Sequence, residues 1–327
     1  MKSIKLLTVF ITALFFSFSA YAASTDLGDN WCSGVKIHFF AGSAEGDGFA
    51  GIVQAGAENA IRDTGANAQI LYSGWASDMM IQQLREAIGA GVDGIGMMGH
   101  PGNEAIMPLA EEAHKAGILM MYQNVDVPEV RAKYGGGYVG ANLATQGEQL
   151  AYEAIRRFKL KARDKAIIIV SPGEKAKREI RTRIVFEDHG MEVVVLGGSS
   201  KQEADPNLAI GLISSALVAN RDTKILVHFS AQMLGNAETF AQASGKEPNE
   251  LIQIGFGTSP QVMSGFAKGY VHLTSEQQPF LQGYLPILAL CQMKVLGTGA
   301  HNQDIGNGFI HTENYKSYID LAKKGLR

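Results

Sequence analysis

The stretch Val35-Lys36-Ile37-His38-Phe39-Phe40, followed by the glycine-containing turn 41–48, decides the fold of this chain. The six residues are mostly apolar and predict a buried strand. Residues 49–63 carry apolar side chains at helical spacing, and Gly65 marks the expected end of that helix. A strand, a tight turn and a helix in this order form the first half of a βαβ unit.

The same unit recurs along the chain in two series, which are separated by the glycine-rich stretch 134–140. The first series predicts further strands at 68–72, 94–98 and 118–123, with helices at 78–88 and 104–116. The second predicts strands at 166–170, 192–196, 224–229, 251–256 and 270–274, with helices at 178–189, 206–219, 235–244 and 260–268. Short strands alternating with helices indicate parallel sheets. We therefore expect an α/β protein with two doubly wound, Rossmann-like lobes.

The first 22 residues predict a secretory signal peptide. Residues 6–18 are almost wholly apolar, and Ala20-Tyr21-Ala22 supplies small residues for a cut between Ala22 and Ala23. A membrane anchor is the alternative, but about 13 apolar residues fall short of the roughly 20 that span a bilayer. A lipoprotein is disfavoured because the first cysteine, Cys32, lies well past the cleavage region. The mature chain is expected in the periplasm.

The length, net charge and cysteine count of the chain limit the kinds of binding partner that can be expected. About 305 residues would remain after cleavage, enough for two domains. The net charge of -3 gives no basic excess, so neither nucleic acid nor an anionic membrane surface is expected as a partner. Cys32 and Cys291 allow one intramolecular disulfide, with two separate buried thiols as the alternative. Neither cysteine has a second ligand at metal-binding spacing, so no metal is expected.

Ligands of open parallel sheets bind outside the carboxyl ends of the strands. The post-strand segments here are rich in hydroxyls, amides, single carboxylates and aromatic rings. Such a mixture suits a neutral, polyhydroxylated molecule, because hydroxyls both donate and accept and a ring face covers C–H groups. These segments are 43–49, 73–78, 99–103, 124–126, 171–178, 230–232, 257–259 and 275–278.

Motifs of several enzyme classes are missing. The chain has no G-x-S-x-G elbow and no Walker A loop, and the glycine-rich turn after the first strand is by itself weak evidence for a nucleotide. Its histidines form no H-x-x-x-H pair. Asp47 and Asp78 could serve as an acid–base couple in glycoside hydrolysis, but exposed loop carboxylates are far commoner than catalytic ones. We expect a binding protein without cofactor rather than an enzyme.

Five short stretches carry a family resemblance that extends over the chain from Val35 onward. They are Asp47-Gly48-Phe49, Gly91-Val92-Asp93-Gly94-Ile95, Ala116-Gly117-Ile118-Leu119-Met120, Tyr138-Val139-Gly140-Ala141-Asn142 and Ile254-Gly255-Phe256-Gly257. In order and spacing the chain resembles the periplasmic sugar-binding proteins of ABC importers, of the ribose/galactose-binding type. These are type I periplasmic binding proteins.

The resemblance implies a first lobe at 23–141 plus 277–306 and a second at 142–276 plus 307–327. Three chain crossings would form the hinge, with the ligand between the lobes. The implied partners are a small carbohydrate and an ABC transporter permease in the inner membrane, and the protein is expected to be a monomer. Because Cys32 and Cys291 fall in the same lobe of this layout, the resemblance favours their disulfide.

Ten ligand-binding residues follow from the resemblance or from position. Phe49 is expected to stack on the ligand, Arg178 to donate two hydrogen bonds, and Gln277 to reach the ligand from the hinge. Phe49 could instead be core, Arg178 a solvated member of the basic run 175–178, and Gln277 hinge packing. Asp47 could be a turn residue or helix cap. The full set is Ser43, Asp47, Phe49, Trp75, His100, Asn124, Arg178, Ser230, Gln232 and Gln277.

Two departures from the family bear on the ligand. Asn124 and Gly257 stand where relatives usually carry aspartates that bind sugar hydroxyls. A charged hydrogen bond contributes about 1.5–3 kcal/mol against roughly 1 for a neutral one, so the usual monosaccharide is in question. The stretch 255–260 is also similar to that of autoinducer-2-binding relatives. We expect a monosaccharide or polyol; the alternative is an autoinducer-2-like signal, or ligand presentation to a chemoreceptor or histidine kinase. A LacI-like regulator shares the fold but is disfavoured by the export signal.

Overall fold

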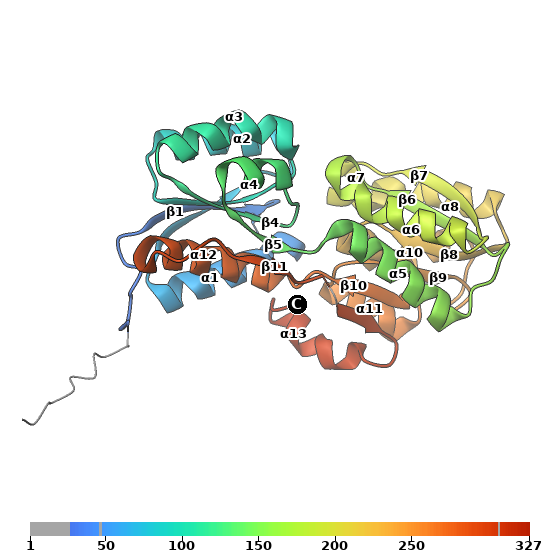
Figure 1. Cartoon of the computed structure of the whole chain (residues 1–327). Coiled ribbons are helices and arrows are strands. Elements are labelled where there is room, and N and C mark those ends of the chain that lie inside the picture. Colours follow the sequence, from blue (N-terminus) through green and yellow to red (C-terminus); the bar gives the residue numbers. More distant parts are fainter. Residues whose placement is uncertain (1–26, 46–47, 307) are drawn as a thin grey trace, which may run out of the picture.

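The computed structural model describes residues 27–45, 48–306 and 308–327. In these residues the chain forms two α/β lobes that lie side by side, each built around a six-stranded sheet (Figure 1). The predicted fold class, two doubly wound parallel-sheet lobes, is confirmed. The predicted leader and its cleavage site lie outside the described residues.

The first sheet is parallel throughout, with strand order β11-β5-β4-β3-β1-β2. Its strands are β1 Lys36–Gly42, β2 Asn67–Tyr72, β3 Gly94–Met98, β4 Leu119–Gln123, β5 Gly137–Gly140 and β11 Asn302–Asp304. The helices of this lobe are α1 Gly48–Thr64, α2 Ser77–Gly89, α3 Gly102–Lys115, α4 Pro128–Tyr134 and α12 Pro279–Leu296.

The second sheet has the order β12-β10-β9-β8-β6-β7, and only β12 runs antiparallel to its neighbour. Its strands are β6 Lys165–Val170, β7 Glu192–Gly197, β8 Thr223–His228, β9 Ile252–Phe256, β10 Leu273–Glu276 and β12 Gly308–His311. Its helices are α5 Leu143–Phe158, α6 Ala176–Asp188, α7 Ser200–Ala204, α8 Ile210–Ala219, α9 Ala231–Gly235, α10 Ala237–Ala243, α11 Pro260–Lys268 and α13 Ile319–Lys323. Short 3₁₀ helices lie at Gly173–Lys175, Pro206–Ala209 and Tyr315–Tyr318.

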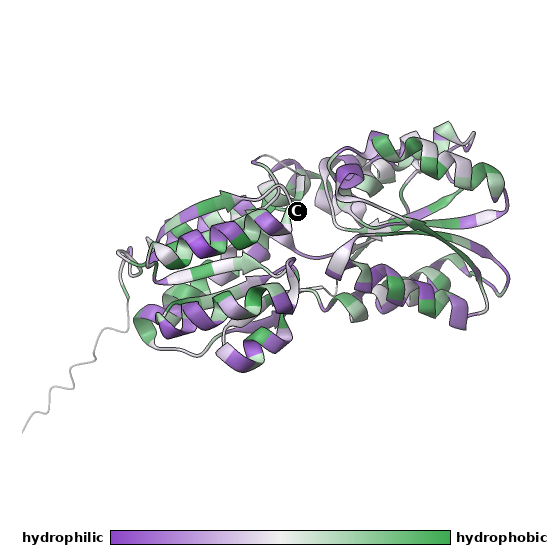
Figure 2. Cartoon of the chain, turned by 90° about the horizontal axis from the view of Figure 1, so that it is seen from above, coloured by the Kyte–Doolittle hydropathy of each residue, from purple (hydrophilic) through white to green (hydrophobic). Residues whose placement is uncertain are grey.

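The central strands are buried on both faces, which explains their unbroken apolar sequence. All five residues of β3 are buried, and β6 contributes Ile167 and Ile169 to one face and Ala166 and Ile168 to the other. Helices α1 and α12 cover one face of the first sheet and α2 and α3 the other (Figure 1). Hydrophilic residues gather on parts of the helices rather than on the central strands (Figure 2).

Helices α1 and α12 pack with close backbone contact, which two glycines permit. A Cβ atom on Gly56 would lie 2.0 Å from the carbonyl oxygen of Phe280, and one on Gly283 would lie 1.9 Å from that of Val53. The same layer contains a disulfide between Cys32 and Cys291, whose Cα atoms are 5.6 Å apart. The N-terminal end of the described chain is thereby tied to α12.

The chain passes between the two sheets three times, from β5 to β6, from β10 to β11, and from β11 to β12. These crossings lie next to one another at the junction of the lobes (Figure 1). Residues far apart in the sequence therefore meet at the junction.

Some helices differ from the sequence prediction. The stretch 206–219 divides into a 3₁₀ helix and α8, and the helix predicted at 235–244 is interrupted at Asn236 between α9 and α10. The glycine-rich stretch 134–140 contains the strand β5. Among the helices of the described chain, none has the length and hydrophobicity needed to cross a bilayer.

Candidate functional site

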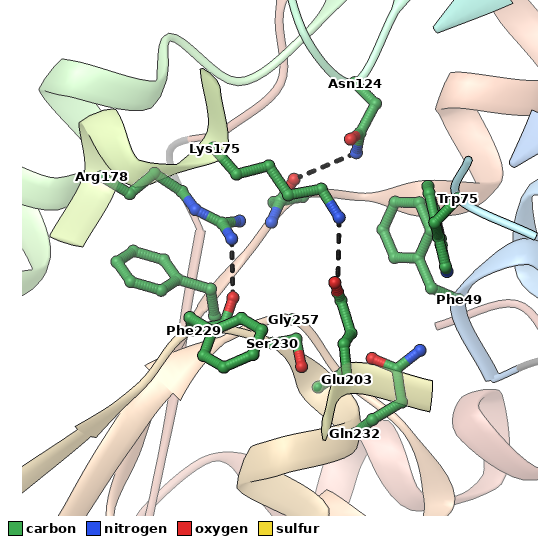
Figure 3. Close-up of a pocket in the computed structure, with 13 residues that line it drawn as sticks. Phe49, Trp75, Asn124, Lys175, Arg178, Glu203, Phe229, Ser230, Gln232 and Gly257 are labelled. Carbon is green, nitrogen blue, oxygen red and sulfur yellow. Dashed lines mark hydrogen bonds and ion pairs between the residues drawn. The ribbon is translucent and has the colours of Figure 1, made fainter. Parts of the chain in front are cut away.

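A pocket lies between the lobes, where the carboxyl ends of strands from both sheets meet (Figure 3). It encloses about 330 Å³ of empty space, part of which opens to solvent. This is the place where doubly wound sheets bind ligands. The lining residues are Phe49, Trp75, Asn124, Lys175, Arg178, Glu203, Phe229, Ser230, Ala231, Gln232, Phe256, Gly257 and Gln277.

Two aromatic rings from the first lobe form one wall. Phe49 is in the first turn of α1 and Trp75 follows β2, with ring centroids 5.9 Å apart. Trp75 has a φ of 61°, which a bulky residue rarely adopts, so the surrounding packing holds it there. The packing includes Gly42, where a Cβ atom would lie 2.7 Å from the indole ring. The Trp75 Nε1 is buried and finds no hydrogen-bond partner among the described residues.

Asn124 enters the pocket from the end of β4, also in the left-handed backbone region, at φ 63°. Asparagine tolerates this conformation better than most residues. Its amide nitrogen donates to Gln282 Oε1 at 3.0 Å and to Gln277 Oε1 at 3.4 Å. With the nitrogen engaged by α12 and the hinge, the Asn124 Oδ1 is left as the acceptor for a ligand hydroxyl.

Arg178 in α6 is a fixed part of the second-lobe wall rather than a solvated charge, because it is only 3% exposed. Its guanidinium donates to the Phe229 carbonyl at 2.7 Å and to Glu179 Oε1 at 3.2 Å, and lies 4.5 Å from the ring centroid of Phe256. Glu179 also accepts hydrogen bonds from the backbone and hydroxyl of Ser171. Burial raises the pKa of Glu179, although Arg178 and Ser171 oppose the rise.

The position of Arg178 depends on a close contact between α5 and α6. A Cβ atom on Gly147 would lie 2.0 Å from the Arg178 carbonyl oxygen. Gly147 therefore lets the two helices approach. The hydroxyl of Thr182 donates to the Gly147 carbonyl at 3.0 Å and strengthens this contact.

Lys175 and Glu203 form an ion pair inside the pocket, with Nζ and Oε1 3.3 Å apart. The Lys175 ammonium also lies 4.2 Å from the ring centroid of Trp75, which makes a cation–π contact between the lobes. On the same wall, the Ser230 hydroxyl accepts a hydrogen bond from the Met233 amide at the start of α9. The hydroxyl hydrogen of Ser230 remains available to a ligand.

The structure gathers seven of the ten predicted site residues around this pocket: Phe49, Trp75, Asn124, Arg178, Ser230, Gln232 and Gln277. Ser43 is buried beneath it, and its carbonyl accepts a hydrogen bond from the Gly74 amide. His100 packs 5.3 Å from Trp75 and lines an adjoining cavity. Burial holds the pKa of His100 well below its usual range, so the ring is neutral. Asp47 lies outside the described residues.

Sequence reasoning did not single out Lys175, Glu203 and Phe229. Lys175 lies within the predicted post-strand segment 171–178 but was grouped with an exposed basic run. Glu203 belongs to α7, which follows the edge strand β7. Applying the carboxyl-end rule to this edge strand as well would have pointed to the segment containing Glu203. No group of three or more histidine, cysteine or acidic side chains suited to a metal ion occurs in the described chain.

Two lobes joined by three crossings, with a mixed aromatic and polar pocket at the junction, define a cleft-type ligand-binding protein. The chain belongs to the family described as "Periplasmic binding protein domain", whose sequence pattern matches residues 38–297.

Individual relatives agree with this assignment. The xylose/arabinose-binding protein XylF of Sulfolobus acidocaldarius is 26% identical over 259 residues, covering 73% of this chain. The match spans only 62% of that protein's length. Solved structures with the same fold include the following two. A galactofuranose-binding protein has a TM-score of 0.78 at 14% identity, covering 90% of this chain and all of that one. A carbohydrate transporter from Acidothermus cellulolyticus 11B in complex with myo-inositol has a TM-score of 0.76 at 20% identity, with coverages of 90% and 99%.

Proposed function

We propose that the protein captures a small neutral carbohydrate, a monosaccharide or polyol, between its lobes and delivers it to an ABC transporter permease in the inner membrane. The observation that carries this proposal is a pocket with contributions from both lobes. Phe49 and Trp75 offer ring faces to the C–H side of a sugar. Asn124 and Ser230 offer polar atoms to its hydroxyls.

The charges around the pocket favour an uncharged ligand. The cations Lys175 and Arg178 are each paired with a carboxylate, Glu203 and Glu179 respectively. Among the described residues that line the pocket, no surplus charge is left to compensate an anionic or cationic ligand, and burying an unpaired charge is costly. Uronic acids and amino sugars should therefore bind more weakly than the neutral sugars of the same size.

The relatives support the same ligand class. Their names refer to xylose and arabinose, to galactofuranose and to myo-inositol, all of them neutral and rich in hydroxyls. The identities are low, so they support the class and not one particular sugar.

Delivery requires the two lobes to respond to the ligand. We propose lobes at 23–141 plus 277–306 and at 142–276 plus 307–327, which move about the three crossings. A ligand that contacts both lobes favours the closed arrangement, whereas one that contacts a single lobe shifts nothing. In this proposal the leader 1–22 directs export and is removed between Ala22 and Ala23, and the mature protein acts as a monomer without cofactor.

A direct test is isothermal titration calorimetry with four neutral probes: D-xylose, L-arabinose, D-fucose and myo-inositol. D-glucuronate serves as the charged compound that should bind more weakly. At a hundredfold excess over Kd, a bound sugar should stabilise the fold by about 2.7 kcal/mol, which thermal unfolding detects. Phe49→Ala should weaken binding at least tenfold, whereas Tyr152→Ala, an exposed aromatic on α5, should not. Absence of binding to every neutral sugar and polyol would refute the ligand class.

The alternative of an autoinducer-2-like signal rested on the stretch 255–260. In the structure the Ser259 hydroxyl accepts a hydrogen bond from the Val262 amide at 3.1 Å, and Pro260 opens α11. Serine at the cap followed by proline is a common helix start. Helix initiation accounts for this stretch without a ligand.

The other alternative is presentation of the ligand to a chemoreceptor or histidine kinase. If a strain that lacks this protein still transports the bound sugar, sensory presentation is the role instead of transport.

A further inference from the structure

The ion pair between Lys175 and Glu203 is an unusual feature of a pocket for a neutral ligand. Their side chains are only 12% and 8% exposed. Lys175 ends the 3₁₀ helix Gly173–Lys175, and Glu203 lies in α7, so the two charges meet inside the cleft from separate segments (Figure 3). Removing two charges from water is costly and is not in itself stabilising. A pair in this position is therefore better explained by a use in binding than by stability.

The other described residues that line the pocket carry no carboxylate. Asn124 is an amide, and Glu203 is the only acidic residue among the described residues that line the pocket. Gly257 has a φ of 90°, and a Cβ atom there would lie 3.0 Å from that of Ala231. An aspartate at position 257 would be strained in this backbone. The one carboxylate of this described lining comes from α7.

Both members of this pair keep polar atoms that remain available to a ligand. Glu203 Oε1 accepts from Lys175, whereas Oε2 accepts no hydrogen bond from the described residues. The Lys175 ammonium carries three N–H donors, of which Glu203 uses one. A carboxylate acceptor beside an ammonium donor matches a pair of adjacent hydroxyls.

We infer that Glu203 and Lys175 together bind two neighbouring hydroxyls of the ligand. Glu203 Oε2 accepts from one hydroxyl and Lys175 Nζ donates to the next. Such binding makes a vicinal diol the feature that the pocket recognises. This inference rests on the proposed function and specifies its ligand class.

The test compares Glu203→Gln, Lys175→Met and the double variant by titration calorimetry with the four neutral probes named above. Glu203→Gln keeps the shape but replaces a charged acceptor, so it should raise Kd about tenfold to a hundredfold. Because both residues act on one diol, the double variant should raise Kd by a smaller factor than the product of the factors for the two single variants. It also removes both charges, which guards against misfolding from one unpaired buried charge. Glu174→Gln is the matched control, since Glu174 pairs with Lys177 and is 40% exposed; its Kd should stay within twofold.

Monodeoxy analogues of the tightest of the four probes show whether the contact is direct. Removal of one particular hydroxyl should weaken the wild type about tenfold and leave Glu203→Gln almost unaffected. If Glu203→Gln binds within twofold of the wild type, or if every deoxy analogue weakens both proteins equally, the inference is wrong and the proposed function stands. If the wild type binds none of the four probes, both fail.

Discussion

Replacing Arg178 by alanine should destabilise the second lobe strongly, because it leaves a buried carboxylate without its cation. Glu179 is fully buried, and the Arg178 guanidinium is 3.2 Å from its Oε1. Removing one partner of a buried ion pair costs about 3–5 kcal/mol. The Phe229 carbonyl loses its donor as well. Set against a total stability of roughly 5–15 kcal/mol, the loss should be large.

The pH dependence of this loss has a definite sign. Burial already raises the pKa of Glu179, and removal of Arg178 raises it further. A carboxyl group whose pKa is higher in the folded state than in the unfolded state binds extra protons on folding. Its unfavourable contribution is absent at low pH and grows as the pH rises above the unfolded value of about 4.3. The difference in unfolding free energy between Arg178→Ala and the wild type should therefore become smaller as the pH is lowered from 7.5 to 5.

Urea unfolding followed by circular dichroism measures both effects. The double variant Arg178→Met/Glu179→Gln removes the two charges together and should recover most of the stability. Arg181→Ala removes a half-exposed arginine three residues further along α6 and should cost less than about 1 kcal/mol. The reasoning is refuted if Arg178→Ala costs less than about 1 kcal/mol, or if the double variant is as unstable as the single one.

Three further predictions concern the fold. Cys32→Ala/Cys291→Ala releases a disulfide that spans 259 residues of sequence, and the loop-closure entropy predicts a loss of about 5 kcal/mol in urea unfolding; a loss below about 1 kcal/mol would contradict it. Gly283→Ala forces a Cβ atom against the Val53 carbonyl and should lower the unfolding free energy by about 1–3 kcal/mol, whereas Gly89→Ala, which meets no neighbour within 4 Å, should not lower it. Burial lowers the pKa of His228 to about 4, so folding excludes a proton that the unfolded chain binds below about 6.5. As the pH falls between those values this group alone should lower the unfolding free energy by about 3 kcal/mol, and His228→Gln should lessen the measured fall by that amount.

Much of the fold could be read from local sequence. The run 166–170 of β6 is apolar because both faces of a parallel sheet are covered, and the alternation with helices requires crossover connections. The break within 206–219 was missed because it depends on a cap. The Asp205 side chain accepts from the Asn207 amide and starts a 3₁₀ turn before α8.

The candidate site was predicted in part, and the reason is geometric. The carboxyl-end rule and the family resemblance found Phe49, Asn124 and Arg178, because each follows a strand directly or opens the next helix. Glu203 was missed because its segment follows an edge strand, and only the tertiary structure places that segment at the pocket.

The sequence by itself determined the class of fold, the edge of each sheet at which a ligand should bind, and the kind of side chain found there, because strand and helix periodicity are local properties. Only the tertiary structure decided which charges are paired. The Lys175 ammonium meets Trp75 of the other lobe and Glu203 of its own, at distances that no spacing in the chain encodes. Those contacts arise from the packing of two separate cores about a shared hinge.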